Sequence, residues 1–151
     1  MKLKLYVGLK IPDTTAITAL NTLQRMGYKT IESLERFQFY EFQASDVSSL
    51  KEKLAKVDLL VNANKHFAIV ALEGEEPREE GFVYVLVKNK GETNEGLLST
   101  LKNRLGFKEL QSVTCGTLWK MHIADPDAKA LAEDVAKDLL ASPHYQEFSV
   151  F

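Results

Sequence analysis

The sequence predicts an α+β fold built from two similar halves, each with the element order β-α-β-β-α-β. Short motifs recur in the same order at a spacing of roughly 80 residues. Each half combines period-two and helical apolar patterns, and an acidic stretch without apolar residues separates the halves. Because each half has only about 75 residues, near the lower limit for an independent core, we expect the halves to share one interior.

The recurring motifs belong to an opening strand, a helix end and a later helix. The pairs are residues 6–10 with 84–88, 25–28 with 104–107, and 58–60 with 138–140. Their spacing suits a duplicated small domain and is too long for a solenoid repeat. Since a duplicated chain can take the place of a symmetric dimer, we expect the contact between the halves to matter for function.

The first half is predicted to cover residues 1–72. Its opening strand alternates apolar and lysine positions, Asp13 suits a helix N-cap, and Gly27 suits the C-cap of the same helix. The elements expected after this helix are strands at 31–34 and 37–42, a helix at 46–61 and a strand at 66–72.

An acidic linker is predicted at residues 73–81, where Pro77 and two glycines interrupt the pattern. Such a like-charge run is usually a solvated connector, although a binding tail has a similar composition. The second half, 82–151, repeats the order of the first. Its expected elements are strands at 82–88, 110–113, 118–123 and 145–151, and helices at 97–105 and 125–141.

This order favours a ferredoxin-like arrangement in each half, with two helices on one face of an antiparallel sheet. The other face is not polar, because Phe82, Tyr84 and Leu86 lie opposite Val83 and Val85 along one strand. We therefore expect both faces to be covered, with the two halves packed sheet against sheet as a pseudo-dimer. The alternative is that the aromatic side chains pack within each half.

Composition argues against several classes of protein. The net charge is −2 without a basic stripe, which disfavours nucleic-acid binding, and no apolar run approaches membrane-spanning length. Cys115 is the single cysteine, so no internal disulfide forms, and we expect a cytoplasmic protein. The general habit of free cysteine predicts that Cys115 is a small, apolar packing residue.

The sequence shows no catalytic constellation. The three histidines, His66, His122 and His144, are spread without the spacing of metal ligands. There is no glycine-rich phosphate loop and no nucleophile signature, and helix capping accounts for Asp125 and Asp127. We therefore expect no catalytic residue and no metal site, and a role in binding or assembly.

The sequence of the C-terminal segment, residues 136–148, resembles the C-terminal sequence of PurS family proteins. In that family a helix that ends in Leu-Leu-Ala-Asn-Pro precedes a short strand of acidic and aromatic residues. PurS is the small subunit of phosphoribosylformylglycinamidine synthase. The family's opening strand resembles residues 6–10 and 84–88, and its helix end resembles 26–28 and 105–107. The resemblance covers nearly the whole chain as two copies, which implies a tandem PurS-like protein.

The chain departs from the family at the turn between the second and third strands. The family's Gly-Lys pair is replaced by Gly116-Thr117 in the second half and by Phe37-Gln38 in the first. The family arginine aligns with Thr114 and Glu35, although Arg36 is adjacent. From this resemblance, the candidate partner or interface residues are Arg36, Gln38, Tyr40, Gly116, Thr117, Trp119, Pro143 and His144.

The resemblance implies a non-catalytic adaptor that bridges a large synthetase subunit and a glutaminase subunit for ammonia transfer. The chain would bind no cofactor, whereas the complex would use ATP, Mg²⁺ and glutamine. The resemblance leaves open whether two tandem chains pair further.

Two other classes share this predicted element order. The first is a tandem ligand-sensing module like ACT domains, in which Gly8 and Gly91 would be poor versions of the usual turn. The second is a dimeric α+β-barrel enzyme, in which His66, His122 or Tyr40 would be catalytic or bind haem.

Overall fold

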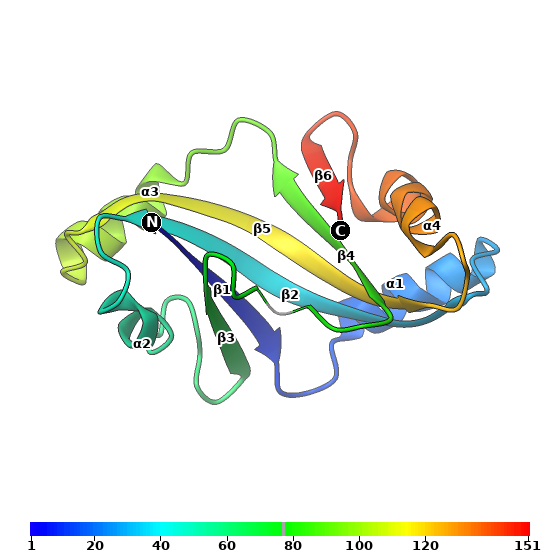
Figure 1. Cartoon of the computed structure of the whole chain (residues 1–151), viewed down its shortest axis with the longest axis horizontal. Helices are drawn as coiled ribbons and strands as arrows, with labels where there is room; N and C mark the ends of the chain where they lie inside the picture. Colours follow the sequence, from blue (N-terminus) through cyan, green and yellow to red (C-terminus); the bar gives the residue numbers. More distant parts are fainter. Residues whose placement is uncertain (77) are drawn as a thin grey trace. The chain divides into compact units, whose positions relative to one another are not determined.

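A computed structural model describes residues 1–76 and 78–151 of the chain (Figure 1). The first repeat contains β1 (Lys2–Leu9), α1 (Thr14–Arg25), β2 (Ile31–Ala44), α2 (Leu50–Leu54) and β3 (His66–Leu72). The second contains β4 (Phe82–Asn89), α3 (Glu95–Ser99), the π-helical turn η1 (Thr100–Arg104), β5 (Leu110–Ile123), α4 (Ala128–Val135), the π-helical turn η2 (Ala136–Leu140) and β6 (Gln146–Val150).

The α+β class is confirmed, but each repeat has the order β-α-β-α-β. The two short strands predicted in the middle of each repeat form one strand of 14 residues, β2 in the first repeat and β5 in the second. The gaps predicted at residues 35–36 and 114–117, and the turn expected at Phe37-Gln38 and Gly116-Thr117, all lie within continuous strands. Polar side chains are compatible with a strand, and Gly116 lies where the backbone of β4 approaches closely.

All six strands belong to one sheet in the order β3-β1-β2-β5-β4-β6. The predicted ferredoxin-like halves, packed sheet against sheet, are therefore not confirmed. Apolar residues on both strand faces predict a covering sheet. In the structure, aromatic side chains on the second face pack beside each other, as Tyr6 does with Phe39 and Tyr84 with Phe151, each at a centroid distance of 5.6 Å.

The chain divides into two compact units that do not coincide with the sequence repeats. The first unit consists of Met1–Lys10, Gln38–Pro77 and Gly91–Cys115. The second unit consists of Ile11–Phe37, Arg78–Lys90 and Gly116–Phe151. Each unit thus contains strands from both repeats and the first helix of the other repeat.

The core of the first unit is formed by apolar side chains of β1, β2 and α2 together with residues of the second repeat. Leu3 and Leu5 of β1 are fully buried, as is Leu101 of η1. Leu110 and Val113 of β5 belong to the same cluster. Burial of this kind contributes roughly 1.5–3 kcal/mol per large apolar side chain, so the second repeat is needed to complete this core.

The core of the second unit is formed by apolar side chains of the second repeat together with residues of the first repeat. Val85 of β4 and Met121 of β5 are fully buried, and so is Leu23 of α1 from the first repeat. Ile31 and Leu34 at the start of β2 pack in this cluster too. The first repeat therefore supplies a helix and part of a strand to a core that otherwise belongs to the second.

Equivalent hydrogen bonds show how closely the two repeats correspond. Lys10 Nζ donates to the Ala63 carbonyl at 2.7 Å, and Lys90 Nζ donates to the Pro143 carbonyl at 3.0 Å. Lys90 stands 80 positions after Lys10. The motif alignment matches Lys10 with Lys88, and the structure corrects that alignment by two residues.

The spacing of the repeats changes along the chain, and a π-helical turn accounts for a one-residue step after the first helix. Thr22 Oγ1 donates to the Thr18 carbonyl, and 78 positions later Thr100 Oγ1 donates to Gly96 in the same way. Gly27, a glycine with positive φ after α1, corresponds to Gly106, which lies 79 positions later in the second repeat. A π turn holds one more residue than an α turn, and η1 lies between these points.

The segment predicted as the linker is partly tied to the strands. In the first unit Lys4 Nζ donates to Glu76 Oε1 at 2.9 Å, and this bond lowers the pKa of Glu76 to about 2. In the second unit Glu79 accepts from Lys120, and its backbone N–H donates to the Tyr84 hydroxyl at 3.0 Å. Pro77, which the linker prediction includes, lies outside the described residues.

Candidate functional site

The candidate site is a groove in the second unit, between α1 and η2. Its volume is about 440 Å³, and we refer to it as the threonine groove. It is lined by Thr14, Thr15, Thr18, Ala19 and Thr22 of α1, Trp119 of β5, and Leu139 and Leu140 of η2. Such a volume lies within the range of small-molecule sites, roughly 300–1,000 Å³.

The sequence of α1 positions the threonine wall. Ala16 and Leu23 are buried in the core of the unit, which orients the helix. Thr14, Thr18 and Thr22 recur every four residues and therefore share one side of the helix. Threonine is short, so this side leaves space that longer side chains would fill. Trp119 of β5, which is only 7% exposed, also lines the groove.

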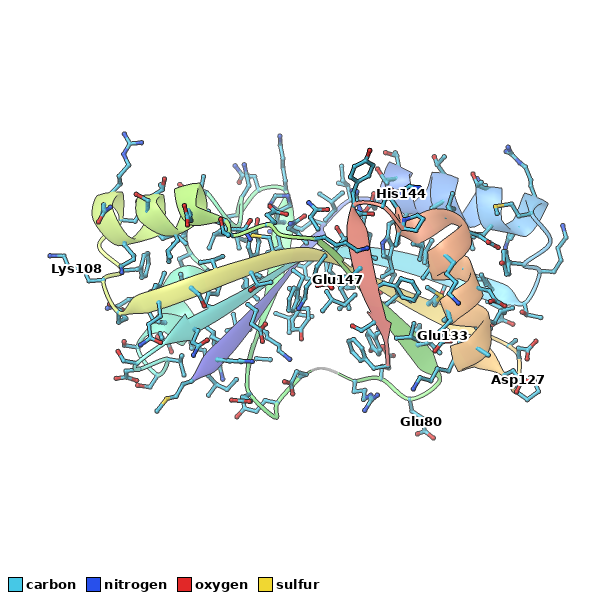
Figure 2. The ribbon with its side chains drawn as sticks, turned by 90° about the horizontal axis from the view of Figure 1, so that it is seen from above. Glu80, Lys108, Asp127, Glu133, His144 and Glu147 are labelled. Atoms are coloured by element: carbon cyan, nitrogen blue, oxygen red, sulfur yellow. The ribbon has the colours of Figure 1, made fainter. Side chains whose placement is uncertain are left out.

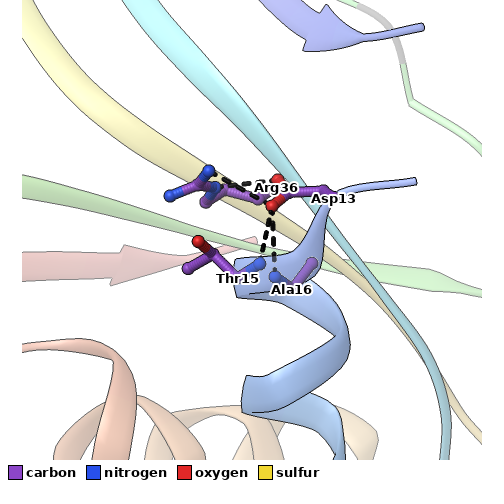
Figure 3. A network of polar contacts seen from close by, with 4 residues as sticks. All are labelled: Asp13, Thr15, Ala16 and Arg36. Atoms are coloured by element: carbon purple, nitrogen blue, oxygen red, sulfur yellow. Dashed lines mark hydrogen bonds and ion pairs between the residues drawn. The ribbon is translucent and has the colours of Figure 1, made fainter. Parts of the chain in front are cut away.

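A bidentate ion pair holds the N-terminus of α1. Arg36 Nε lies 2.9 Å from Asp13 Oδ2, and Arg36 Nη2 lies 3.2 Å from Asp13 Oδ1. Asp13 Oδ1 also accepts from the backbone N–H groups of Thr15 and Ala16, at 3.0 and 3.3 Å (Figure 3). One carboxylate therefore caps the helix and attaches it to β2.

A second polar contact joins the other end of α1 to η2. The Tyr28 hydroxyl donates to Asp138 Oδ2 across 110 residues of sequence. This hydrogen bond, with burial and the negative charges of Asp138 and Asp134, raises the pKa of Tyr28 to about 12. The two walls of the threonine groove are thus fixed at both ends of α1, which favours a preformed site.

The chemistry of the groove suits an uncharged occupant. Hydroxyl groups line one wall, two leucines line the other, and none of the lining side chains carries a charge. Such a surface can bury an apolar group while a few hydrogen bonds orient it.

Only one of the predicted site residues lines this groove, and a second lies at its end. Trp119 is among the lining residues, and Arg36 binds Asp13 at the start of α1. Gln38 is exposed on β2, opposite Val7. Tyr40 lies opposite Leu5 in the first unit, where burial, with the nearby Cys115, raises the pKa of its hydroxyl.

The remaining predicted residues have structural surroundings of their own. A Cβ on Gly116 would lie 2.7 Å from the Val87 carbonyl oxygen, and Thr117 is paired with Val87 in the ladder. The Pro143 carbonyl accepts from Lys90, and His144 is exposed in the loop before β6 (Figure 2).

The histidines considered for catalysis occupy ordinary polar contacts. His66 Nδ1 accepts from the Asn62 backbone N–H at 3.0 Å and closes a turn. His122 Nδ1 lies 2.7 Å from Glu32 Oε2. Within residues 1–76 and 78–151, no cluster of three or more His, Cys, Asp or Glu side chains could hold a metal ion.

The threonine wall was missed at the level of sequence. Its signal is the polar i, i+4, i+8 row at Thr14, Thr18 and Thr22, on a helix whose other faces include Ala16 and Leu23. A polar helix face ordinarily indicates solvent exposure. The row becomes part of a groove only because η2 comes from the other repeat.

The comparisons with known proteins add no family. Neither the protein-family models nor the curated proteins match this chain. In the part of the chain that the structure describes, no helix combines the length and the apolar character needed to cross a lipid bilayer.

Proposed function

We propose that this chain is a non-catalytic adaptor subunit of phosphoribosylformylglycinamidine synthase. In this proposal it is a tandem PurS-like protein that bridges the synthetase and glutaminase subunits in the cytoplasm. It binds no cofactor of its own, and the complex uses ATP, Mg²⁺ and glutamine. The proposal starts from the resemblance of residues 6–10, 84–88 and 136–148 to PurS.

The observation that carries the proposal is the exchange of segments between repeats. Each compact unit draws on both repeats, so one polypeptide supplies what two copies of a small subunit would supply as an intertwined dimer. Joining the copies makes their association intramolecular, with an effective concentration on the order of mM. Two compact units that are joined in one chain cannot dissociate, which suits a protein that binds two enzymes at once.

The threonine groove is the part of the second unit best suited to contact one partner. Its uncharged lining would receive an apolar side chain, such as leucine or phenylalanine, from a partner enzyme. The ties at Arg36 and Tyr28 keep the walls in place, so little ordering of this chain would accompany binding.

The decisive experiment measures amidation by the purified synthetase and glutaminase subunits with and without this chain. We expect glutamine-dependent amidation to require the chain. Amidation driven by added ammonia should need it far less, because free ammonia bypasses transfer between subunits. Equal glutamine-dependent rates without the chain, together with no co-purification, would exclude the adaptor role.

The groove contact is tested separately by filling it. Thr18→Phe places a ring in the groove and should weaken binding to one partner by roughly tenfold or more. Ile17→Phe is the matched control, since Ile17 is on the same helix, is 49% exposed and does not line the groove. Equal binding by both variants would remove the groove from the interface.

The groove also favours a second candidate, a ligand-sensing module like ACT domains. An uncharged cavity of about 440 Å³ is large enough for an amino acid side chain. Calorimetric titration with amino acids distinguishes the two functions. Heat at micromolar ligand that Thr18→Phe abolishes would favour sensing, whereas no heat with any amino acid would exclude it.

A further inference from the structure

The outer strand β3 of the first unit has an unusually apolar free edge. Among residues 1–76 and 78–151, β3 has a strand neighbour only on the β1 side. Its seven residues, His66–Leu72, include no Lys, Arg, Asp, Glu or Pro. Phe67 is 40% exposed and Ile69 is 38% exposed on the strand face away from the core. Long apolar edges of this kind pair readily with another strand.

The backbone of β3 is oriented for such pairing. The Lys10 backbone N–H donates to the Lys65 carbonyl, so residues 67, 69 and 71 follow as the hydrogen-bonded partners of β1. Because hydrogen-bonding direction alternates along an antiparallel strand, the N–H and C=O groups of Ala68 and Val70 are directed toward the free edge.

The other outer strand, β6, has the protection that β3 lacks. The equivalent hydrogen bonds Lys10–Ala63 and Lys90–Pro143 place residues of β6 80 positions after those of β3. Phe67 and Ile69 of β3 therefore correspond to Glu147 and Ser149 of β6, which are both exposed. Glu147 is labelled in Figure 2. A charged residue on an outer strand opposes edge-to-edge pairing.

We propose that β3 pairs antiparallel with β3 of a second copy of this chain, about a two-fold axis at Ile69. Ile69 is the middle residue of β3, so this register uses the whole strand and joins Ala68 to Val70 of the partner copy. The pairing is self-complementary, because an uncharged strand meets its own copy without like-charge repulsion.

A second copy is a better occupant than a strand of a different protein for two reasons. The edge carries no charge that would select an oppositely charged partner, whereas a symmetric pair needs none. The two outer strands also differ, so assembly through β3 closes at a dimer, while two equally apolar edges would allow open chains. The inference stands independently of the adaptor role.

Sedimentation analysis across protein concentration gives the first test. The wild-type chain should sediment as a dimer, at twice the chain mass of 17.0 kDa. Phe67→Glu with Ile69→Ser copies the β6 residues onto β3 and should raise the dissociation constant roughly tenfold or more. Glu147→Phe with Ser149→Ile is the matched control at the other edge and should add species larger than a dimer.

Cross-linking tests the register. In a Cys115→Ser background, Ile69→Cys should form a disulfide-linked dimer on mild oxidation, because facing residues of a non-hydrogen-bonded pair are close enough to bridge. The Ser149→Cys variant should migrate as a monomer on non-reducing gels. Circular dichroism of each variant confirms that the monomer is folded.

The Val70 amide gives a readout specific to the strand pair. Its hydrogen exchange should slow with increasing wild-type concentration and should not do so in the Phe67→Glu, Ile69→Ser variant. A wild-type monomer at all concentrations would overturn the proposal. A dimer with concentration-independent exchange at Val70, or with no cross-link at position 69, would overturn it equally.

Discussion

Gly116 gives the sharpest test of the packing within the second unit. A Cβ at this position would lie 2.7 Å from the Val87 carbonyl oxygen, 3.3 Å from Lys88 Cγ and 3.4 Å from Leu86 Cδ1. The lysine and leucine side chains can move, but the carbonyl belongs to the β4–β5 ladder, in which Val87 pairs with Thr117. Gly116→Ala therefore requires the two strands to separate locally.

We expect Gly116→Ala to destabilise the fold by about 1–3 kcal/mol, as overpacking does in well-packed regions. For a protein of this size, that corresponds to a fall in Tm of about 2–12 °C. Urea unfolding followed by the fluorescence of Trp119, the only tryptophan, measures the change directly. Trp119 lies in the core of the same unit and therefore reports on the affected region.

Gly96→Ala is the matched control. Gly96 lies in α3, has no atom within 4 Å of a built Cβ, and does not have a positive φ. Alanine is favoured over glycine in a helix by about 1 kcal/mol, so this variant should be slightly more stable than the wild type. The reasoning would be refuted if both substitutions changed stability in the same direction, or if Gly116→Ala had no effect.

Three further predictions concern single side chains. Asp13→Ala should lower the free energy of unfolding by about 1–2 kcal/mol, because it removes a helix cap and leaves Arg36 without its carboxylate. Asp13→Ser should lower it less, because serine can still cap the helix. Thermal unfolding of both variants measures the difference. The pKa of Glu76 is lowered from 4.5 to about 2 by its bond to Lys4, so its contribution to stability is complete above pH 4.5 and is lost as the pH falls toward 2; acid unfolding of Glu76→Gln should lack this component. Burial, with the charge of Glu92, raises the pKa of Cys115 from 9.0 to about 11, so its alkylation at pH 7.5 should be about a hundredfold slower than in the urea-unfolded chain, and an equal rate would contradict the burial.

Local patterns predicted most of the elements but not their partners. The alternation of Leu3, Leu5 and Val7 predicted β1 correctly, and Asp13 caps α1 as expected. Helical spacing shows that Leu23 is buried, but it carries no information on which repeat supplies the surrounding core. That partner is set by long-range contacts, which short-range periodicity does not encode.

The continuity of β2 and β5 and the lining of the threonine groove also depend on long-range contacts that local sequence patterns do not encode. The sequence predicts gaps at residues 35–36 and 114–117 between short strands, but tertiary pairing keeps both strands continuous. Trp119 is a predicted site residue and lines the groove. Leu139 and Leu140 lie in the helix predicted at 125–141, but the sequence does not show that this part is π-helical or that it lies beside α1. The interface roles of Gln38, Thr117 and His144 stay predictions.

Each compact unit is built from both repeats. This composition is tested most directly by producing residues 1–76 and 78–151 as separate chains and measuring circular dichroism and mass across a range of concentrations. Each core includes buried residues of the other repeat, such as Leu101 in the first unit and Leu23 in the second, so neither chain should fold as a monomer. Folding should appear only on mixing or self-association, with a midpoint that depends on concentration. A cooperatively folded monomer of either chain, with a Tm independent of concentration, would contradict the account.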